Sequence, residues 1–235
     1  MIVAIPKGPQ SGVKNVKNSL RWQVEDRYII ERHGFMTYPQ FLDNGFVAEK
    51  GPNIKWLEMN LKRYGNGLIR FAVAPDNMPG TAEKLRREYD VEWIYPLHSR
   101  DEDFSNFDWV GMPHREDWRD YDLKTFLKLT EGKKRWYLGF WDETNPEYVL
   151  LFDGFDTRIP DAYASKYGKM WLGWGKARPV DPMIPLEEVQ EYNLLSFKIA
   201  LRELIARQAK IQPLTFFLGE IPSQSQKDAN KGIIT

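Results

Sequence analysis

About eight short apolar runs alternate with helix-sized gaps along the chain, and this alternation constrains the fold more than any other feature. Short apolar runs bounded by turn signals are typical of buried strands. Strands separated by helix-length segments predict a parallel α/β sheet, and eight repeats favour a closed (β/α)8 barrel of the TIM type. A doubly wound open sheet is the alternative, although no Gly-rich phosphate loop is present. The predicted strands are Ile2–Pro6, Met36–Val47, Gly67–Pro75, Val91–Leu97, Asp108–Met112, Lys134–Trp141, Tyr148–Phe155 and Lys169–Trp174.

Helical spacing of apolar residues fills several of the gaps. It predicts helices over 54–64, over 81–89 with Thr81 as N-cap, and over 123–129. The longest amphipathic pattern, 186–209, predicts a C-terminal helix that closes the fold. We therefore expect one barrel domain over residues 1–221, followed by a flexible polar tail over 222–235.

The charge balance and the lack of cysteine exclude several classes of protein. Lys+Arg and Asp+Glu are both 33, so the chain is neither a strongly basic nucleic-acid coat nor an acidic tail protein. Without cysteine, disulfides, thiolate zinc sites and cysteine nucleophiles are excluded. No apolar stretch approaches the roughly 18 residues of a membrane span, and the apolar start is too short for a signal peptide. We expect a cytoplasmic protein with no membrane partner.

Three aspartates stand at the ends of predicted strands: Asp43, Asp76 and Asp156. In an α/β barrel, residues that follow the strands line one mouth, where catalytic groups lie. These carboxylates therefore predict a reaction centre. Structural alternatives exist for each one, because Asp43 begins an Asp-Asn-Gly turn signal, Asp76 and Asp156 could cap helices, and Asp153 rivals Asp156.

Six segments between residues 43 and 160 resemble, in order, motifs of the tRNA-guanine transglycosylases. Asp43–Phe46 resembles their Asp-Ser-Gly-Gly-aromatic motif with one glycine fewer, and Phe155–Pro160 resembles their nucleophile loop, Phe-Asp-Cys-Val-Leu-Pro. The four other segments are Ala74–Pro79, Tyr95–Ser99, Val110–Pro113 and Arg135–Gly139. The resemblance implies a pentosyltransferase on a barrel without the family's cysteine-rich zinc subdomain.

The resemblance also implies the chemistry. Asp156 would attack C1′ of a guanosine in nucleic acid and expel guanine, after which a 7-deazaguanine would displace the aspartate. Asp43 would be the acid and base that handles the proton of the leaving and entering bases. No cofactor and no metal are expected.

Five further positions would bind the base. By resemblance Asp76 would accept hydrogen bonds from the guanine edge, and His98 would stand where the family has a glutamine that contacts O6. Gly111 would let the backbone approach the base, and Phe46 and Leu138 would sandwich it. For His98 the alternative is a structural histidine at a strand end.

DNA is slightly favoured over tRNA as the expected nucleic-acid substrate. Small zinc-free relatives of the family insert 7-deazaguanines into DNA, and the chain lacks the subdomain that contacts tRNA in bacterial members. Whether the protein forms a homodimer or needs a partner subunit stays open. The predicted nucleic-acid contacts are Arg158, Lys166, Lys169, Lys176 and Arg178, interleaved with Trp171 and Trp174, for which core packing is the alternative.

Two other functions fit the same residues. Three strand-end aspartates on a barrel could belong to a hydrolase, either a glycosidase or a phosphoesterase that uses Mg²⁺ or Mn²⁺. A barrel that has lost its activity could instead serve as a nucleic-acid-binding subunit.

Overall fold

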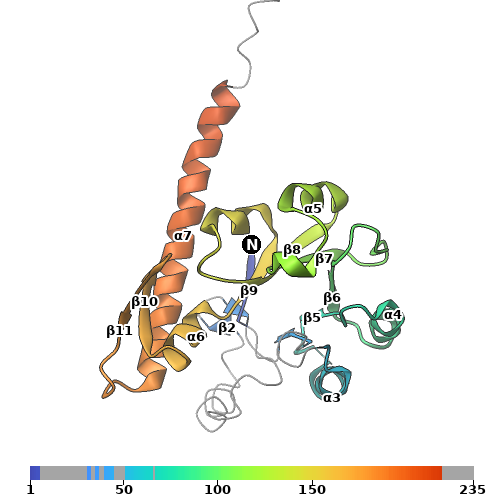
Figure 1. Cartoon of the computed structure of the whole chain (residues 1–235), viewed down its shortest axis with the longest axis horizontal. Coiled ribbons are helices and arrows are strands. Elements are labelled where there is room, and N and C mark those ends of the chain that lie inside the picture. Colours follow the sequence, from blue (N-terminus) through green and yellow to red (C-terminus); the bar gives the residue numbers. More distant parts are fainter. Residues whose placement is uncertain (6–30, 33–34, 37–39, 45–50, 66, 219–235) are drawn as a thin grey trace, which may run out of the picture.

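A computed structural model of the chain describes residues 1–5, 31–32, 35–36, 40–44, 51–65 and 67–218 (Figure 1). Its main sheet has the order β2-β3-β1-β9-β8-β7-β6-β5-β4, in which every neighbouring pair is parallel except β2 and β3. Eight parallel strands thus form a nearly closed barrel of the α/β class, with β2 as an antiparallel edge. The strands are β1 (Ile2–Ala4), β2 (Glu31–Arg32), β3 (Phe35–Met36), β4 (Phe41–Leu42), β5 (Phe71–Val73), β6 (Glu92–Pro96), β7 (Trp109–Pro113), β8 (Lys134–Phe140) and β9 (Gly154–Thr157).

Side chains from seven strands fill the barrel interior. Phe41 of β4 stacks on Trp136 of β8, with ring centroids 5.2 Å apart, although these strands stand four places apart in the sheet order. A flat sheet could not bring them together, so this contact shows that the sheet curls on itself. The interior cluster contains Ala4, Met36, Phe41, Phe71, Val73, Ile94, Trp109 and Trp136.

The alternate residues of the strands point outward and pack under the helices, as the period of two in a strand requires. Helices follow four strands: α3 (Ile54–Tyr64) after β4, α4 (Pro79–Glu88) after β5, α5 (Leu123–Leu129) after β7 and α6 (Ile159–Ser165) after β9. A short 3-10 helix, η1 (Glu116–Trp118), precedes α5, whereas residues 97–108 between β6 and β7 form no helix. The described part of the outer layer therefore has fewer helices than a regular (β/α)8 fold.

The predicted strand over Tyr148–Phe155 is wrong for most of its length. Residues 146–151 form the 3-10 helix η2 (Pro146–Leu151), and β9 starts only at Gly154. Val149 and Phe152 are buried, three residues apart, while Tyr148 and Leu151 are exposed. Burial at every third position is typical of a 3-10 helix, and a continuous apolar run does not distinguish this pattern from a strand.

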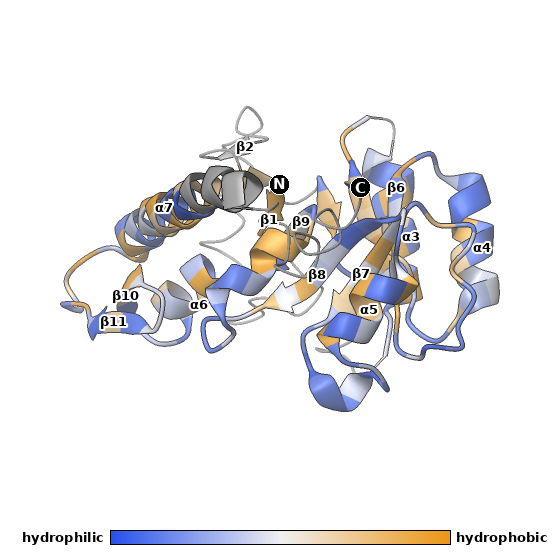
Figure 2. Cartoon of the chain, turned by 90° about the horizontal axis from the view of Figure 1, so that it is seen from above, coloured by the Kyte–Doolittle hydropathy of each residue, from blue (hydrophilic) through white to orange (hydrophobic). Residues whose placement is uncertain are grey.

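The predicted strand over Lys169–Trp174 exists but is not part of the barrel. It is β10 (Lys169–Gly173), which pairs antiparallel with β11 (Lys176–Pro179) in a separate hairpin beside α7 (Leu186–Leu218). Trp171 is fully buried while Leu172 is exposed, as in a strand with one solvated face. Figure 2 shows the hairpin at the edge of the molecule, with α6 beside it and with β6 and α4 on the opposite side. The predicted number of eight parallel strands is still correct, because the predicted strand Met36–Val47 corresponds to two strands, β3 and β4.

The predicted helices are largely confirmed. Residues 54–64 and 123–129 match α3 and α5, and α7 begins at Leu186 as expected but continues to Leu218. Thr81 is not an N-cap, because α4 begins at Pro79, a residue that suits the first turn of a helix. The predicted flexible tail, 222–235, lies outside the described residues. No helix in the described part of the chain is both long enough and apolar enough to cross a membrane.

Gly154 fits where no larger residue would. A Cβ on Gly154 would lie 2.5 Å from Cζ3 of Trp136 and 3.3 Å from Cβ of Ile2, in the packed interior. We expect Gly154→Ala to lower the free energy of unfolding by about 1–3 kcal/mol, because the buried indole has no room to move. Chemical denaturation measures this, and Gly80→Ala in α4, where nothing lies within 4 Å, is the control expected to be neutral or stabilising.

Candidate active site

The polar residues singled out in the sequence gather at the carboxyl ends of the parallel strands. Asp43 follows β4, Asp76 follows β5 and His98 follows β6. Asp156 is the penultimate residue of β9, shortly before α6. In a barrel these ends form one mouth, so four elements distant in sequence contribute to one site. This mouth is the place where active sites of such barrels lie.

The carboxylate of Asp156 is buried and held by two N–H donors from β8. Oδ1 accepts a hydrogen bond from the indole Nε1 of Trp136 at 2.9 Å, and Oδ2 accepts one from the backbone N of Gly139 at 3.1 Å. Asp156 is only 7% exposed. The two donors fix the orientation of the carboxylate and leave a lone pair on each oxygen.

The environment of Asp156 favours its protonated form. Burial in the barrel mouth, with the charge of nearby Asp43 added to it, raises the pKa of Asp156 to about 7. The hydrogen bonds from Trp136 and Gly139 act in the opposite direction but are outweighed. Two interacting carboxylates, one of which titrates near neutrality, can divide the acid and nucleophile roles of a displacement reaction.

Asn44 connects the ends of β4 and β5. Its Nδ2 donates to the carbonyl of Ala74 at 2.6 Å and to Oδ2 of Asp76 at 2.5 Å. Since Asn44 directly follows Asp43, this bridge sets the spacing between Asp43 and Asp76. Asp43 itself is partly exposed.

Both ring nitrogens of His98 have hydrogen-bond partners. Nε2 lies 2.6 Å from Oδ1 of Asp76, and Nδ1 lies 2.7 Å from the carbonyl oxygen of Trp118. Burial alone would lower the pKa of His98, but the hydrogen bonds to Asp76 and Trp118 outweigh it and raise the pKa. His98 therefore holds Asp76 in place through the short contact between Nε2 and Oδ1. To donate to a base, as the sequence suggests, it would have to give up one of these partners.

Gly111 and Leu138 are neighbours at the mouth. A Cβ on Gly111 would lie 2.6 Å from Cδ1 of Leu138, so the leucine occupies the space that the glycine leaves open. The predicted approach of a base to the Gly111 backbone would require the end of the Leu138 side chain to move. Phe46, the other predicted wall of the base site, lies outside the described residues.

The predicted nucleic-acid contacts are all exposed but do not surround the mouth evenly. Arg158, two residues after Asp156, pairs with Asp161 at 3.0 Å. The remaining four lie at the end of α6 and on the β10–β11 hairpin: Lys166, Lys169, Lys176 and Arg178. Arg158 is thus the predicted cation nearest to Asp156 along the chain.

Trp171 belongs to the core, and Trp174 is partly buried against it. Trp171 is fully buried, donates from Nε1 to Oδ1 of Asp142 at 3.0 Å and packs on Phe197 of α7. Trp174 packs edge-on against Trp171 and Phe197. Asp142 also accepts from Tyr163 at 2.9 Å and from the Gly175 backbone at 3.1 Å. The packing alternative therefore holds for Trp171. Through these hydrogen bonds, Asp142 links the hairpin to the end of β8.

Sequence reasoning missed three groups that shape the site: Trp136, the backbone of Gly139, and Asn44. The period of two along β8 places Trp136 on the same face as Leu138, which was a predicted site residue. That signal could have found Trp136. Asn44 was given no role beyond its place in the turn signal and in the Asp43–Phe46 segment, and nothing local in the sequence reports its bridge to Asp76.

Among the described residues, no group of three or more potential metal-ligating side chains is close enough to hold a metal ion. Comparison with models of protein families, with characterised proteins and with solved structures finds no significant match.

Proposed function

We propose that the protein is a base-exchange glycosyltransferase on a TIM-type barrel, which replaces guanine in nucleic acid with a 7-deazaguanine. DNA is favoured slightly over tRNA as the polymer. The observation that supports this most is Asp156: a buried carboxylate at the barrel mouth, oriented by two N–H donors and coupled to Asp43. A buried, oriented carboxylate is suited to attack a sugar carbon, because its desolvation raises its reactivity toward an oxocarbenium-like centre.

The proposed reaction has two displacements at C1′ of the target nucleotide. An oxygen of ionised Asp156 forms a bond to C1′ while the C1′–N9 bond breaks, and Asp43 delivers a proton to the leaving guanine. The entering 7-deazaguanine then loses a proton to Asp43, and its nitrogen bonds to C1′ as the ester to Asp156 breaks. In the ester, the carbonyl oxygen of Asp156 keeps one N–H donor, which stabilises the intermediate.

Asp76 is proposed to select the base. Each of its oxygens already accepts one hydrogen bond, from His98 or Asn44, and keeps a second lone pair. These lone pairs suit the N1–H and exocyclic amine of guanine, two donors that adenine does not present together. The hydrogen bonds with His98 and Asn44 fix the direction in which these lone pairs point.

We expect Asp76→Asn to weaken binding of guanine or a 7-deazaguanine about tenfold to a hundredfold. The change replaces an acceptor with an amide donor, and hydrogen bonds to a charged group are worth about 1.5–3 kcal/mol. Titration calorimetry with the free bases measures it, with exposed Asp101→Asn as the matched control. Unchanged affinity in a folded Asp76→Asn protein would refute the assignment.

The proposed activity is tested by incorporation of a labelled base. The protein is incubated with labelled 7-cyano-7-deazaguanine and, separately, with duplex DNA, single-stranded DNA and tRNA. Incorporation into one polymer would establish the reaction and its substrate together. No incorporation into any of them, with a folded protein, would count against the proposal.

A glycoside hydrolase is the second candidate, and the pKa of about 7 at Asp156 favours it. Retaining glycosidases pair a carboxylic acid of raised pKa with a carboxylate nucleophile, and Asp156 and Asp43 could fill these roles. The two functions differ in the group that takes the place of guanine at C1′, which is water in a hydrolase and the entering base in the exchange enzyme. A hydrolase would release guanine and leave an abasic site without any added base, whereas the exchange enzyme would need the entering 7-deazaguanine for net product.

A further inference from the structure

Helix α7 carries an exposed apolar stripe on the side that faces away from the barrel core. Its inner face buries Leu194, Phe197 and Leu201 in the core. On another face, Tyr192, Leu195 and Ile199 are 39%, 41% and 57% exposed, and their spacing of three and four residues aligns them along the helix. Such an aligned set is unusual for a helix that faces only water.

The neighbouring hairpin extends this surface. Exposed Leu172 of β10 and the edge of Trp174 border a shallow groove of about 330 Å³, whose opposite wall is formed by Ile199 and Ala200 of α7. Lys176, Glu203 and Arg207 form its polar margin. An apolar centre with a charged margin is the usual composition of a protein–protein interface.

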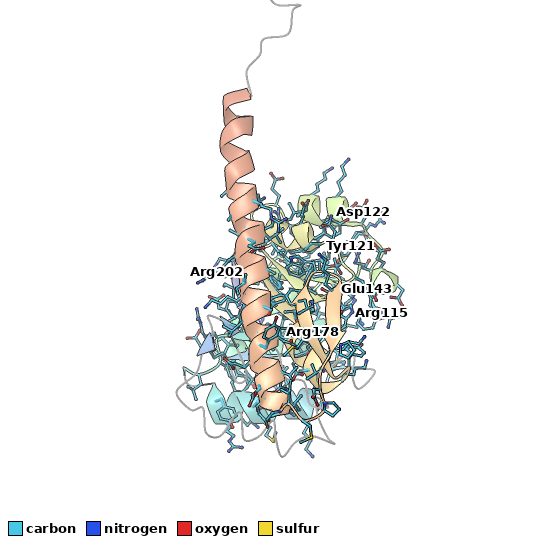
Figure 3. All side chains as sticks on the ribbon, turned by 90° about the vertical axis from the view of Figure 1, so that its left-hand side faces the viewer. Arg115, Tyr121, Asp122, Glu143, Arg178 and Arg202 are labelled. Atoms are coloured by element: carbon cyan, nitrogen blue, oxygen red, sulfur yellow. The ribbon has the colours of Figure 1, made fainter. Side chains whose placement is uncertain are left out.

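The C-terminal part of α7 extends beyond the other described elements (Figures 1 and 3). The helix has 33 residues, so it is about 50 Å long. An isolated helical segment is only marginally stable in water unless an apolar face is packed. A second packed surface would therefore stabilise the part of α7 that the barrel does not cover.

The charges of α7 are complementary to those of the same helix turned end for end. Residues 186–201 contain three glutamates and one lysine, whereas residues 202–218 contain three cations and one glutamate. A second α7 in antiparallel orientation sets each acidic half against a basic half, and a parallel one sets like charges together. Figure 3 shows Arg202, the first of these cations, on the part of α7 above Arg178.

We propose that this surface, the α7 stripe with Leu172, is a two-fold interface between two copies of the chain, with the two α7 helices antiparallel. A two-fold interface is self-complementary, which the apolar stripe and the opposed charged halves both satisfy. The inference does not rest on the proposed catalytic function, because none of these residues lies at the barrel mouth.

The first test is the mass of the full chain in solution. Sedimentation equilibrium at micromolar concentration is expected to give twice the chain mass of 27.6 kDa. Ile199→Glu is expected to raise the dimer dissociation constant at least about tenfold, because it buries a charge in the apolar centre. Ile205→Glu is the matched control, since Ile205 is also exposed but lies about 120° around the same helix. A monomeric wild type, or equal effects of the two variants, would overturn the proposal.

The second test uses the absence of cysteine from the chain. Single cysteines at Tyr192, Ile199 and Ala206 are oxidised separately, and disulfide-linked dimers are counted by mass. Antiparallel helices cross-link only where the cysteine lies near the two-fold axis, so one region of the helix is expected to react. Equal cross-linking at Tyr192→Cys and Ala206→Cys would indicate parallel helices, and no cross-linking at any of the three would remove α7 from the interface.

Discussion

Asp156→Asn is expected to reduce base exchange by at least about a thousandfold while the protein stays folded. The side chain keeps its size but loses the negative charge that forms the bond to C1′, and loss of a nucleophile is among the largest single effects in enzymes. Incorporation of labelled 7-deazaguanine under single-turnover conditions measures the loss. Far-ultraviolet circular dichroism and the unfolding midpoint verify the fold.

Asp153→Asn is the control, because Asp153 was the rival of Asp156 in the sequence. Asp153 is exposed before β9 begins and accepts a hydrogen bond from the Arg135 backbone at 2.8 Å. It therefore stands at the opposite end of the strand from the mouth. Exchange by Asp153→Asn should stay within about twofold of wild type. An active Asp156→Asn protein would contradict the covalent mechanism, and an inactive Asp153→Asn protein would contradict the choice between the two aspartates.

The sequence predicted the parallel sheet and most of its strands because these strands are buried on both faces. Such strands form continuous apolar runs, as in Val91–Leu97 and Lys134–Trp141, and they match β6 and β8 closely. Burial at every third position in η2 produces a run of the same composition, so the same rule failed at Tyr148–Leu151. A continuous apolar run shows that its residues are apolar. It distinguishes a strand from a 3-10 helix only when the exposed positions are polar and so mark the spacing of the buried ones.

The candidate site was predictable where position along a strand decides it. Asp43, Asp76 and Asp156 follow or end strands, and parallel strands bring their carboxyl ends together. What the sequence could not supply is the set of contacts between these ends: Asn44 to Asp76, His98 to Trp118, and Trp136 to Asp156. Each joins residues 20 or more positions apart, and the pairing of neighbouring strands and the loops that follow them determine these contacts.

The raised pKa of Asp156 should make the protein less stable as the pH rises from about 4 to about 7. The unfolded chain releases this proton near pH 4, whereas the folded protein holds it to about 7, so the folded state binds more protons between these values. The contribution of Asp156 to stability therefore falls as pH increases through this window and is constant above it. About three pH units correspond to roughly 4 kcal/mol, so the ionised form that the proposed reaction needs is the costly one.

Comparison with Asp156→Asn isolates this effect from all other titrating groups. Free energies of unfolding in urea are measured for both proteins between pH 4 and pH 8. The stability of Asp156→Asn relative to wild type is expected to rise by a few kcal/mol across the range, since only wild type must bury a charge. Asp153→Asn is the matched control at an exposed position. A difference between wild type and Asp156→Asn that does not change with pH would mean that Asp156 ionises as an ordinary carboxylate, and the argument from its burial would fail.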